Sequence, residues 1–197
     1  MAAVTVALSR ELVLDAARAR LERGGADDLS LRGVARDLGV TAPALYAYVD
    51  HKQDLLAAVA TEHFDRLLAR FDATEADDPL DRIRALARAY VDHALESPSL
   101  FRLMFRYPPA PTAGAATFPP AARVFEAASA TVAAAVEAGA LAVDDVALAS
   151  MTMWAAVHGV TEVLLMGFAF DEGGGADALV TSVIETVLAG QTRALAS

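Results

Sequence analysis

The 197 residues include no cysteine and only one lysine, Lys52. Without cysteine, disulfides, thiolate metal sites and thiol nucleophiles are excluded. No segment approaches the ~18 uninterrupted apolar residues of a membrane span. The best candidate, residues 151–170, is interrupted by His158 and Glu162. Residues 1–25 mix acidic and basic side chains with apolar ones, unlike a signal peptide. We therefore expect a cytoplasmic protein without a membrane partner.

Positive charge is also scarce, since the formal net charge is −10 at pH 7. Residues 1–60 hold seven basic and eight acidic residues, whereas residues 61–197 hold nine basic and eighteen acidic residues. The negative charge is therefore concentrated in the C-terminal part. An N-terminal part that is nearly neutral can still present one basic face to nucleic acid.

Strand patterns are almost absent, and amphipathic helical patterns follow one another along the chain. Five of the eight prolines lie in residues 107–122, which predicts a loop there. We expect an all-α fold, with an N-terminal three-helix bundle followed by an antiparallel helical domain. The expected helices, about nine in number, cover residues 9–23, 31–38, 42–48, 50–71, 78–96, 97–106, 121–138, 144–170 and 176–194.

The second and third expected helices have the proportions of a helix-turn-helix. Ala35 is small where the two helices would cross, and Gly39 can take the positive φ that the turn requires. Leu45 would fill the core beneath the turn. An ordinary pair of antiparallel helices uses the same residue types, so the spacing alone leaves both interpretations open.

Side chains expected on the outer surface favour DNA binding. Residues 42–44, with the sequence Ala-Pro-Ala, are small enough to approach base edges in the major groove. The hydroxyls of Tyr46 and Tyr48 and the ammonium of Lys52 are suited to phosphates. Lys52 also lies where a helix begins, and a helix N-terminus favours anions. The alternatives are a tyrosine of the core and a solvated surface lysine.

The stretch LSLRGVARDLGVTAPALYAYVDHKQDLLAAV, residues 29–59, resembles the DNA-binding signature of tetracycline-repressor-type (TetR family) regulators. MWAAVHGVTEVLL, residues 153–165, resembles the Trp…His-Gly segment of one branch of that family. The resemblance implies a helix-turn-helix DNA-binding domain over residues 1–52 and a ligand-binding and dimerisation domain over residues 53–197. It also implies a regulator that is not an enzyme.

The resemblance further implies a repressor that binds a palindromic DNA operator as a homodimer and is released by a small hydrophobic effector, with no cofactor. Arg32 matches a position that reaches a base, commonly guanine. Ala42 and Ala44 offer only methyl contacts, so we expect specificity to depend on Arg32, groove shape and water. The implied DNA contacts are Arg32, Thr41, Ala42, Pro43, Ala44, Tyr46, Tyr48, His51 and Lys52.

The family resemblance assigns the last two helices to a dimer interface and the middle helices to an effector pocket. The alternative is that both sets complete the core of a single chain. The expected dimer residues are Val157, Val160, Leu164, Val180, Val183, Ile184, Val187 and Leu188. The expected pocket residues are Tyr90, His93, Phe101, Met104, Phe105, Phe118, Phe125, Met151, Trp154 and His158.

Three other functions are alternatives to this one. A transcriptional activator would have the same architecture. A helical carrier of hydrophobic ligands would explain the aromatic residues but not the combination of Arg32, Tyr46, Tyr48 and Lys52. An enzyme would need a reactive constellation that the sequence lacks. His158 and Glu162 have the spacing of two metal ligands on a helix, but no third ligand accompanies them, so we expect no metal site.

Overall fold

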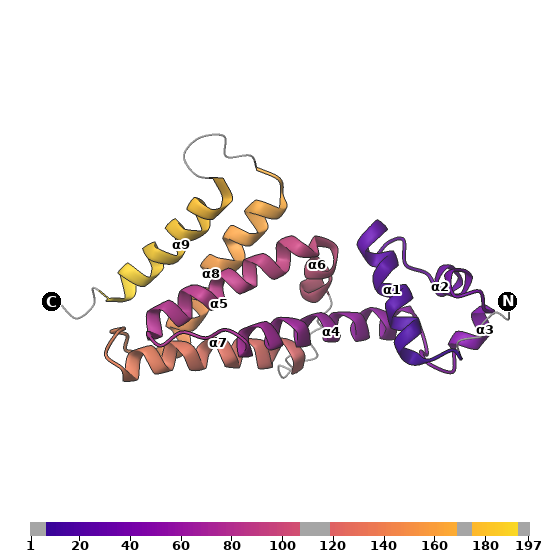
Figure 1. Cartoon of the computed structure of the whole chain (residues 1–197), viewed down its shortest axis with the longest axis horizontal. Coiled ribbons are helices and arrows are strands. Elements are labelled where there is room, and N and C mark those ends of the chain that lie inside the picture. Colours follow the sequence, from indigo (N-terminus) through magenta and orange to yellow (C-terminus); the bar gives the residue numbers. More distant parts are fainter. Residues whose placement is uncertain (1–6, 107–118, 169–174, 193–197) are drawn as a thin grey trace. The chain divides into compact units, whose positions relative to one another are not determined.

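The computed structural model describes residues 7–106, 119–168 and 175–192, and within these ranges every regular secondary-structure element is a helix (Figure 1). The expectation of an all-α fold is confirmed. The helices in the described ranges are α1 (Arg10–Gly24), α2 (Leu31–Asp37), α3 (Ala42–Leu45), α4 (Lys52–Asp72), α5 (Pro79–Glu96), α6 (Pro98–Arg106), α7 (Pro119–Glu137), α8 (Val146–Leu165) and α9 (Gly175–Thr192).

Short polar side chains begin several helices. Ser9 Oγ accepts a hydrogen bond from the N–H of Leu12 at 3.3 Å. Ser30 Oγ accepts one from the N–H of Gly33 at 3.1 Å. Each bond satisfies a backbone donor that has no partner inside the helix. The serine side chains therefore define the first residues of α1 and α2.

Other helix ends differ from the expectation. α3 ends at Leu45 rather than at residue 48. After Leu45 the α-helical pattern is interrupted, because the N–H of Tyr48 bonds to the Leu45 carbonyl, three residues back instead of four. α7 begins at Pro119, since proline is tolerated in a first helical turn. α8 ends at Leu165 rather than near residue 170.

The chain packs as two compact units. Unit 1 consists of residues 1–63 and 97–113, and unit 2 of residues 64–96 and 114–197. The division falls inside α4, because the first half of this helix buries Leu55, Leu56 and Val59 in unit 1. This packing division differs from the functional division at residue 52 that the sequence predicts.

Unit 1 is a small helical bundle whose core is made by α1, α2, α3, the start of α4, and α6. Val13, Ala17 and Leu21 form the buried side of α1. α6 packs on α1, so a helix that lies late in the sequence completes the N-terminal bundle. α6 covers the core with Leu100, Phe101, Leu103 and Met104.

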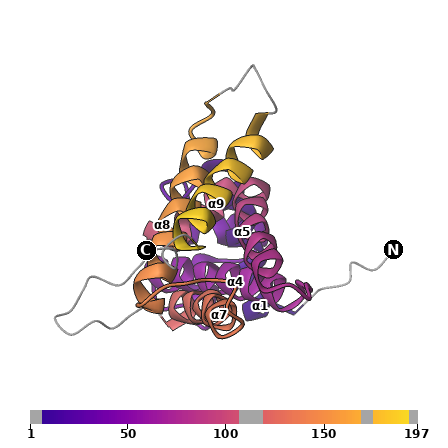
Figure 2. The same ribbon diagram turned by 90° about the vertical axis from the view of Figure 1, so that its left-hand side faces the viewer.

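Unit 2 is built on α5, α7, α8 and α9, with the end of α4. α8 packs against α5, α7 and α9, and it lies beside α9 in both views of the chain (Figures 1 and 2). By length and composition α8 is the one helix among the described residues that is apolar enough to cross a membrane. Its packing on three neighbouring helices is that of a core helix.

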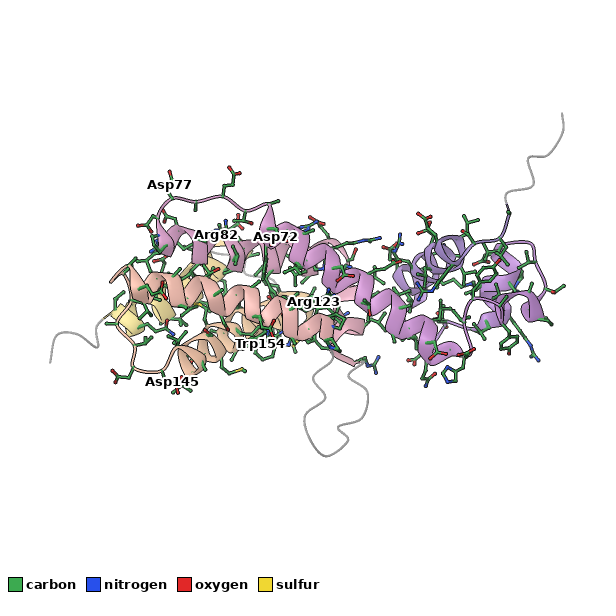
Figure 3. All side chains as sticks on the ribbon, turned by 90° about the horizontal axis from the view of Figure 1, so that it is seen from below. Asp72, Asp77, Arg82, Arg123, Asp145 and Trp154 are labelled. Carbon is green, nitrogen blue, oxygen red and sulfur yellow. The ribbon has the colours of Figure 1, made fainter. Side chains whose placement is uncertain are left out.

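Ion pairs join the helices of unit 2 at the surface. Arg84 of α5 binds Glu185 of α9 through two nitrogens, with Nε to Oε1 at 2.6 Å and Nη2 to Oε2 at 3.0 Å. Arg123 of α7 binds Asp65 of α4 at 2.6 Å, and its side chain is labelled in Figure 3. A single exposed pair contributes only about 0–1 kcal/mol. The apolar core therefore contributes most of the stability that holds these helices together.

Candidate nucleic-acid interface

The turn between α2 and α3 has the geometry that a helix-turn-helix requires. Gly39 has φ +68°, so the expectation of a positive φ at this residue is confirmed. The N–H of Val40 returns to the Ala35 carbonyl at 2.9 Å, closing the end of α2. Leu45 is fully buried below the turn. These residues orient α3 with its other side toward solvent.

The outward side of α3 is small and uncharged. Thr41 and Pro43 are exposed, and Ala42 and Ala44 are half-buried. Tyr46 directly follows the helix, and 56% of its surface is exposed. Arg32, in the first turn of α2, is also exposed. This surface has the small profile that entry into a major groove needs.

The cations of unit 1 fall into two groups. Arg18 pairs with Asp15 at 2.6 Å and Glu62 at 3.0 Å, which ties α1 to α4. Arg20 forms a bidentate pair with Asp37 and holds the pKa of that carboxyl below its ordinary value. By contrast, no described carboxylate forms an ion pair with Arg32 or Lys52. Their charges therefore remain available to an anion from outside the chain.

The start of α4 has a cap that the sequence did not predict. The backbone N–H of His51 donates to Oδ2 of Asp54 at 3.0 Å, and the His51 ring also pairs with this carboxylate. In the sequence, Asp50 and Gln53 have the same spacing and would suit a capping box that begins one residue earlier. The spacing of three residues correctly indicates a cap at the start of this helix. The residues that form it are His51 and Asp54, one position later in the chain, because α4 begins at Lys52. His51 thus has an acidic partner within the chain.

Tyr48 is placed differently from Tyr46. Its side chain is half-buried, and its hydroxyl donates to the backbone carbonyl of Leu8 at 2.7 Å. Leu8 lies just before α1. No local pattern in the sequence indicates this contact, since the two residues are 40 positions apart.

Part of the expected effector pocket gathers in unit 2, on α5 and α8. The hydroxyl of Tyr90 and Nδ1 of His158 share a hydrogen bond of 2.8 Å. The ring of Trp154, labelled in Figure 3, stacks on His158 with the centroids 5.0 Å apart and the planes at 14°. Burial raises the pKa of the Tyr90 hydroxyl and lowers the pKa of His158, although Glu162 opposes the second effect. Both shifts favour the neutral forms of these groups.

The other expected pocket residues are more scattered. In unit 2, His93 is buried, Phe125 is half-buried and Met151 is exposed. In unit 1, Phe101 and Met104 are buried in the core formed with α1, and Phe105 packs against Phe101 with ring centroids 5.1 Å apart. Phe118 lies outside the described residues. The described part of the chain contains no group of three or more side chains arranged to hold a metal ion.

The residues expected at the dimer interface lie mostly on the inner sides of α8 and α9. Five of the eight are buried within unit 2 of the single chain, and the other three are half-buried. The buried five are Val157, Val160, Val180, Ile184 and Leu188, and the half-buried three are Leu164, Val183 and Val187. The outer side of α8 instead carries Ala155 and Gly159, and the outer side of α9 carries Ser182, Thr186 and Ala189.

Comparison with known proteins gives consistent matches for both parts of the chain. The family model described as "Bacterial regulatory proteins, tetR family" matches residues 13–59. The model described as "Tetracyclin repressor-like, C-terminal domain" matches residues 83–187. Together these two matches include the turn, α3 and most of the helices of unit 2.

Individual proteins agree with the family models. The uncharacterized HTH-type transcriptional regulator Rv0681 of Mycobacterium tuberculosis is 30% identical over 192 residues, which cover 94% of this chain and 83% of that protein. Tetracycline repressor protein class D of Escherichia coli is 46% identical over 55 residues, 28% of this chain and 25% of that protein. A solved structure of a protein with unknown function from Rhodococcus sp. RHA1 is 28% identical, with a TM-score of 0.83, and the match covers 98% of this chain and 100% of that chain.

Proposed function

Since the chain belongs to the TetR family of helix-turn-helix transcriptional regulators, and is therefore a regulator rather than an enzyme, we propose that it is a ligand-responsive repressor. In this proposal a homodimer in the cytoplasm binds a palindromic DNA operator, and a small hydrophobic effector releases it. The observation that carries the proposal is the small outward surface of α3, preceded in the chain by Arg32 and followed by Lys52, two cations that form no ion pair with a described carboxylate.

The DNA contacts follow from this surface. α3 enters the major groove, where Ala42, Pro43 and Ala44 approach the bases with methyl and methylene groups. Arg32 reaches a base edge with its planar guanidinium, which suits O6 and N7 of guanine. Thr41, Tyr46 and Lys52 hold the phosphates on either side of the groove. His51 adds a phosphate contact only if its ring leaves Asp54.

A homodimer is proposed because one unit makes too few contacts for useful affinity. Two copies of α3 would lie a whole number of ~34 Å DNA turns apart. The buried residues of α8 and α9 hold the two helices together within one chain. Contact with a second copy would therefore use the outer residues, including Ala155, Gly159 and Ser182, whose small side chains allow two helices to approach closely.

Response to an effector is proposed from the neutral aromatic cluster of Tyr90, Trp154 and His158. The stacked rings offer apolar contact, and the hydrogen-bonded pair offers a polar group for orientation. An effector that binds one of two conformations more tightly shifts the equilibrium toward it by its difference in affinity. α4 would transmit the change, because this single helix belongs to both units. The name of the class D tetracycline repressor supports repression as the sign of regulation.

The proposal is tested by selecting binding sites from a pool of random DNA duplexes. We expect a palindromic consensus that a dimer binds, and we expect one or more hydrophobic compounds from a screened collection to release it. Selection of no sequence would contradict DNA recognition and would favour a ligand carrier. Recruitment of RNA polymerase to a promoter by the bound protein would instead show an activator.

A further inference from the structure

The hydroxyl of Tyr48 joins two parts of unit 1 that are distant in sequence. It donates to the Leu8 carbonyl at 2.7 Å, just before Ser9, the N-cap residue of α1. The α1 hydrogen-bond ladder begins one residue later, because the N–H of Val13 bonds to the Ser9 carbonyl and the N–H of Leu12 bonds to Ser9 Oγ. The Leu8 carbonyl therefore has no role in the helix ladder, and the phenol is its partner.

The backbone on the Tyr48 side is held in place by the core. The N–H groups of Tyr48 and Val49 both bond to the Leu45 carbonyl, at 2.9 and 3.1 Å. Leu45 is fully buried and Val49 is buried. The ring cannot swing toward solvent without giving up the Leu8 carbonyl. The contact is thus part of how the end of α3 is built.

Tyr48 and Tyr46 differ in whether the hydroxyl proton is free to be donated to a phosphate. A tyrosine hydroxyl has one proton to donate, and a phosphate oxygen can only accept. While Tyr48 donates to Leu8, it has nothing to offer a phosphate. Tyr46 is different, since it is mostly exposed and makes no side-chain hydrogen bond to any described residue. The two phenols therefore suit different tasks.

We propose that Tyr48 is a positioning residue of the DNA-reading unit, which holds the start of α1 to the end of α3 and does not contact phosphate. This inference rests on the proposed DNA binding. α3 covers only the four residues Ala42–Leu45, so its own hydrogen bonds define its direction poorly. A tether directly after the helix fixes the direction in which its small side chains face the groove.

The first test uses the full-length protein without DNA. Tyr48→Phe keeps the ring and removes the hydroxyl, and Tyr46→Phe makes the same change two residues away. Hydrogen exchange at the amides of Leu12 and Val13 should become about five- to tenfold faster in Tyr48→Phe, because one hydrogen bond that holds the start of α1 is lost. Tyr46→Phe should exchange like the wild type. Unchanged exchange in Tyr48→Phe would overturn the tether.

The second test uses a duplex that the wild-type protein selects from random DNA, with single phosphates replaced in turn by neutral methylphosphonates. Tyr48→Phe should weaken binding by about fivefold on every duplex of the series, since it acts through the orientation of α3. Tyr46→Phe should weaken binding to every duplex except one. The exception is the duplex in which the phosphate contacted by Tyr46 is replaced by a methylphosphonate.

Two results on DNA would overturn the proposal. One is a Tyr48→Phe effect that disappears at one particular methylphosphonate, because the phenol would then touch that phosphate. The other is equal affinity of variant and wild type, because the tether would then not serve DNA binding. If the wild type selects no duplex, the proposed function fails, and the exchange measurement still decides whether the tether exists.

Discussion

Replacement of Lys52 by alanine should weaken binding to all DNA sequences by about the same factor. Lys52 is the first residue of α4, is half-buried, and forms no ion pair with a described carboxylate. Its ammonium and the N-terminal end of α4 together favour a phosphate. Because the phosphate backbone is the same at every base pair, the loss should not depend on sequence.

The salt dependence gives the magnitude. Each phosphate that a cation neutralises contributes about 0.9 to the slope of log K against log salt concentration. Two copies of Lys52 in a homodimer should therefore lower the absolute slope by about 1.8. Over a fourfold rise in salt, from about 50 to about 200 mM, the difference in affinity between wild type and variant should shrink by roughly tenfold.

Fluorescence anisotropy of a labelled duplex at several salt concentrations measures this slope. The selected duplex and a scrambled duplex should show the same change. Lys52→Arg keeps the charge and should retain most of the slope. Arg23→Ala is the matched control, since it removes one positive charge at the end of α1, where Arg23 faces Asp37 at 3.6 Å. It should leave the slope unaltered.

A slope for Lys52→Ala equal to that of the wild type would refute the phosphate contact. So would a loss of affinity confined to the selected duplex, because this would place Lys52 at a base. An equal fall in slope for Arg23→Ala would show that net charge alone, and not the place of Lys52, determines the effect.

Three further substitutions have defined outcomes. Leu45→Ala should lower the free energy of unfolding by about 2–5 kcal/mol, because it leaves a cavity below α3. The control Leu95→Ala, at a side chain 42% exposed, should lower it by less than about 1 kcal/mol. Equal midpoints of urea unfolding for the two variants would contradict this expectation. Arg32→Ala should relax base preference at one position per half-site, and an unaltered preference in selection from random DNA would count against a base contact. Arg84 lowers the pKa of Glu185 from its ordinary 4.5, so the pair stabilises the fold above that value and the effect is lost as the pH falls through the lowered pKa. Glu185→Gln should accordingly be less stable than the wild type at pH 7 and equal to it in acid, and a difference that persists in acid would contradict the ionic origin.

The residues that act locally could be predicted from the sequence. Ser9 and Ser30 begin helices because a hydroxyl directly before a helix satisfies an unpaired N–H. Gly39 takes a positive φ because it has no Cβ. Lys52 and the small residues of α3 could be assigned to a surface because their neighbours at helical spacing are apolar. For such features the partner lies within a few positions in the sequence.

The features that depend on distant partners could not be predicted in this way. The periodicity of α6 shows that Phe101 and Met104 face a core, but it does not show that the core is that of unit 1. The apolar stripes of α8 and α9 likewise include Val160 and Ile184 without showing that both are buried within one chain. A pattern along a helix shows which side is buried and not which element buries it.

The sequence by itself determined the all-helical fold class, the turn at Gly39, and a third helix whose outer residues are small, with Arg32 before it and Lys52 after it in the chain. Only the tertiary structure decided that α6 completes unit 1 and that the proton of Tyr48 goes to Leu8. The physical reason is that caps, turns and helical periodicity depend on neighbours in the chain. The partner of a buried face or a single hydroxyl depends on which distant segments folding brings together.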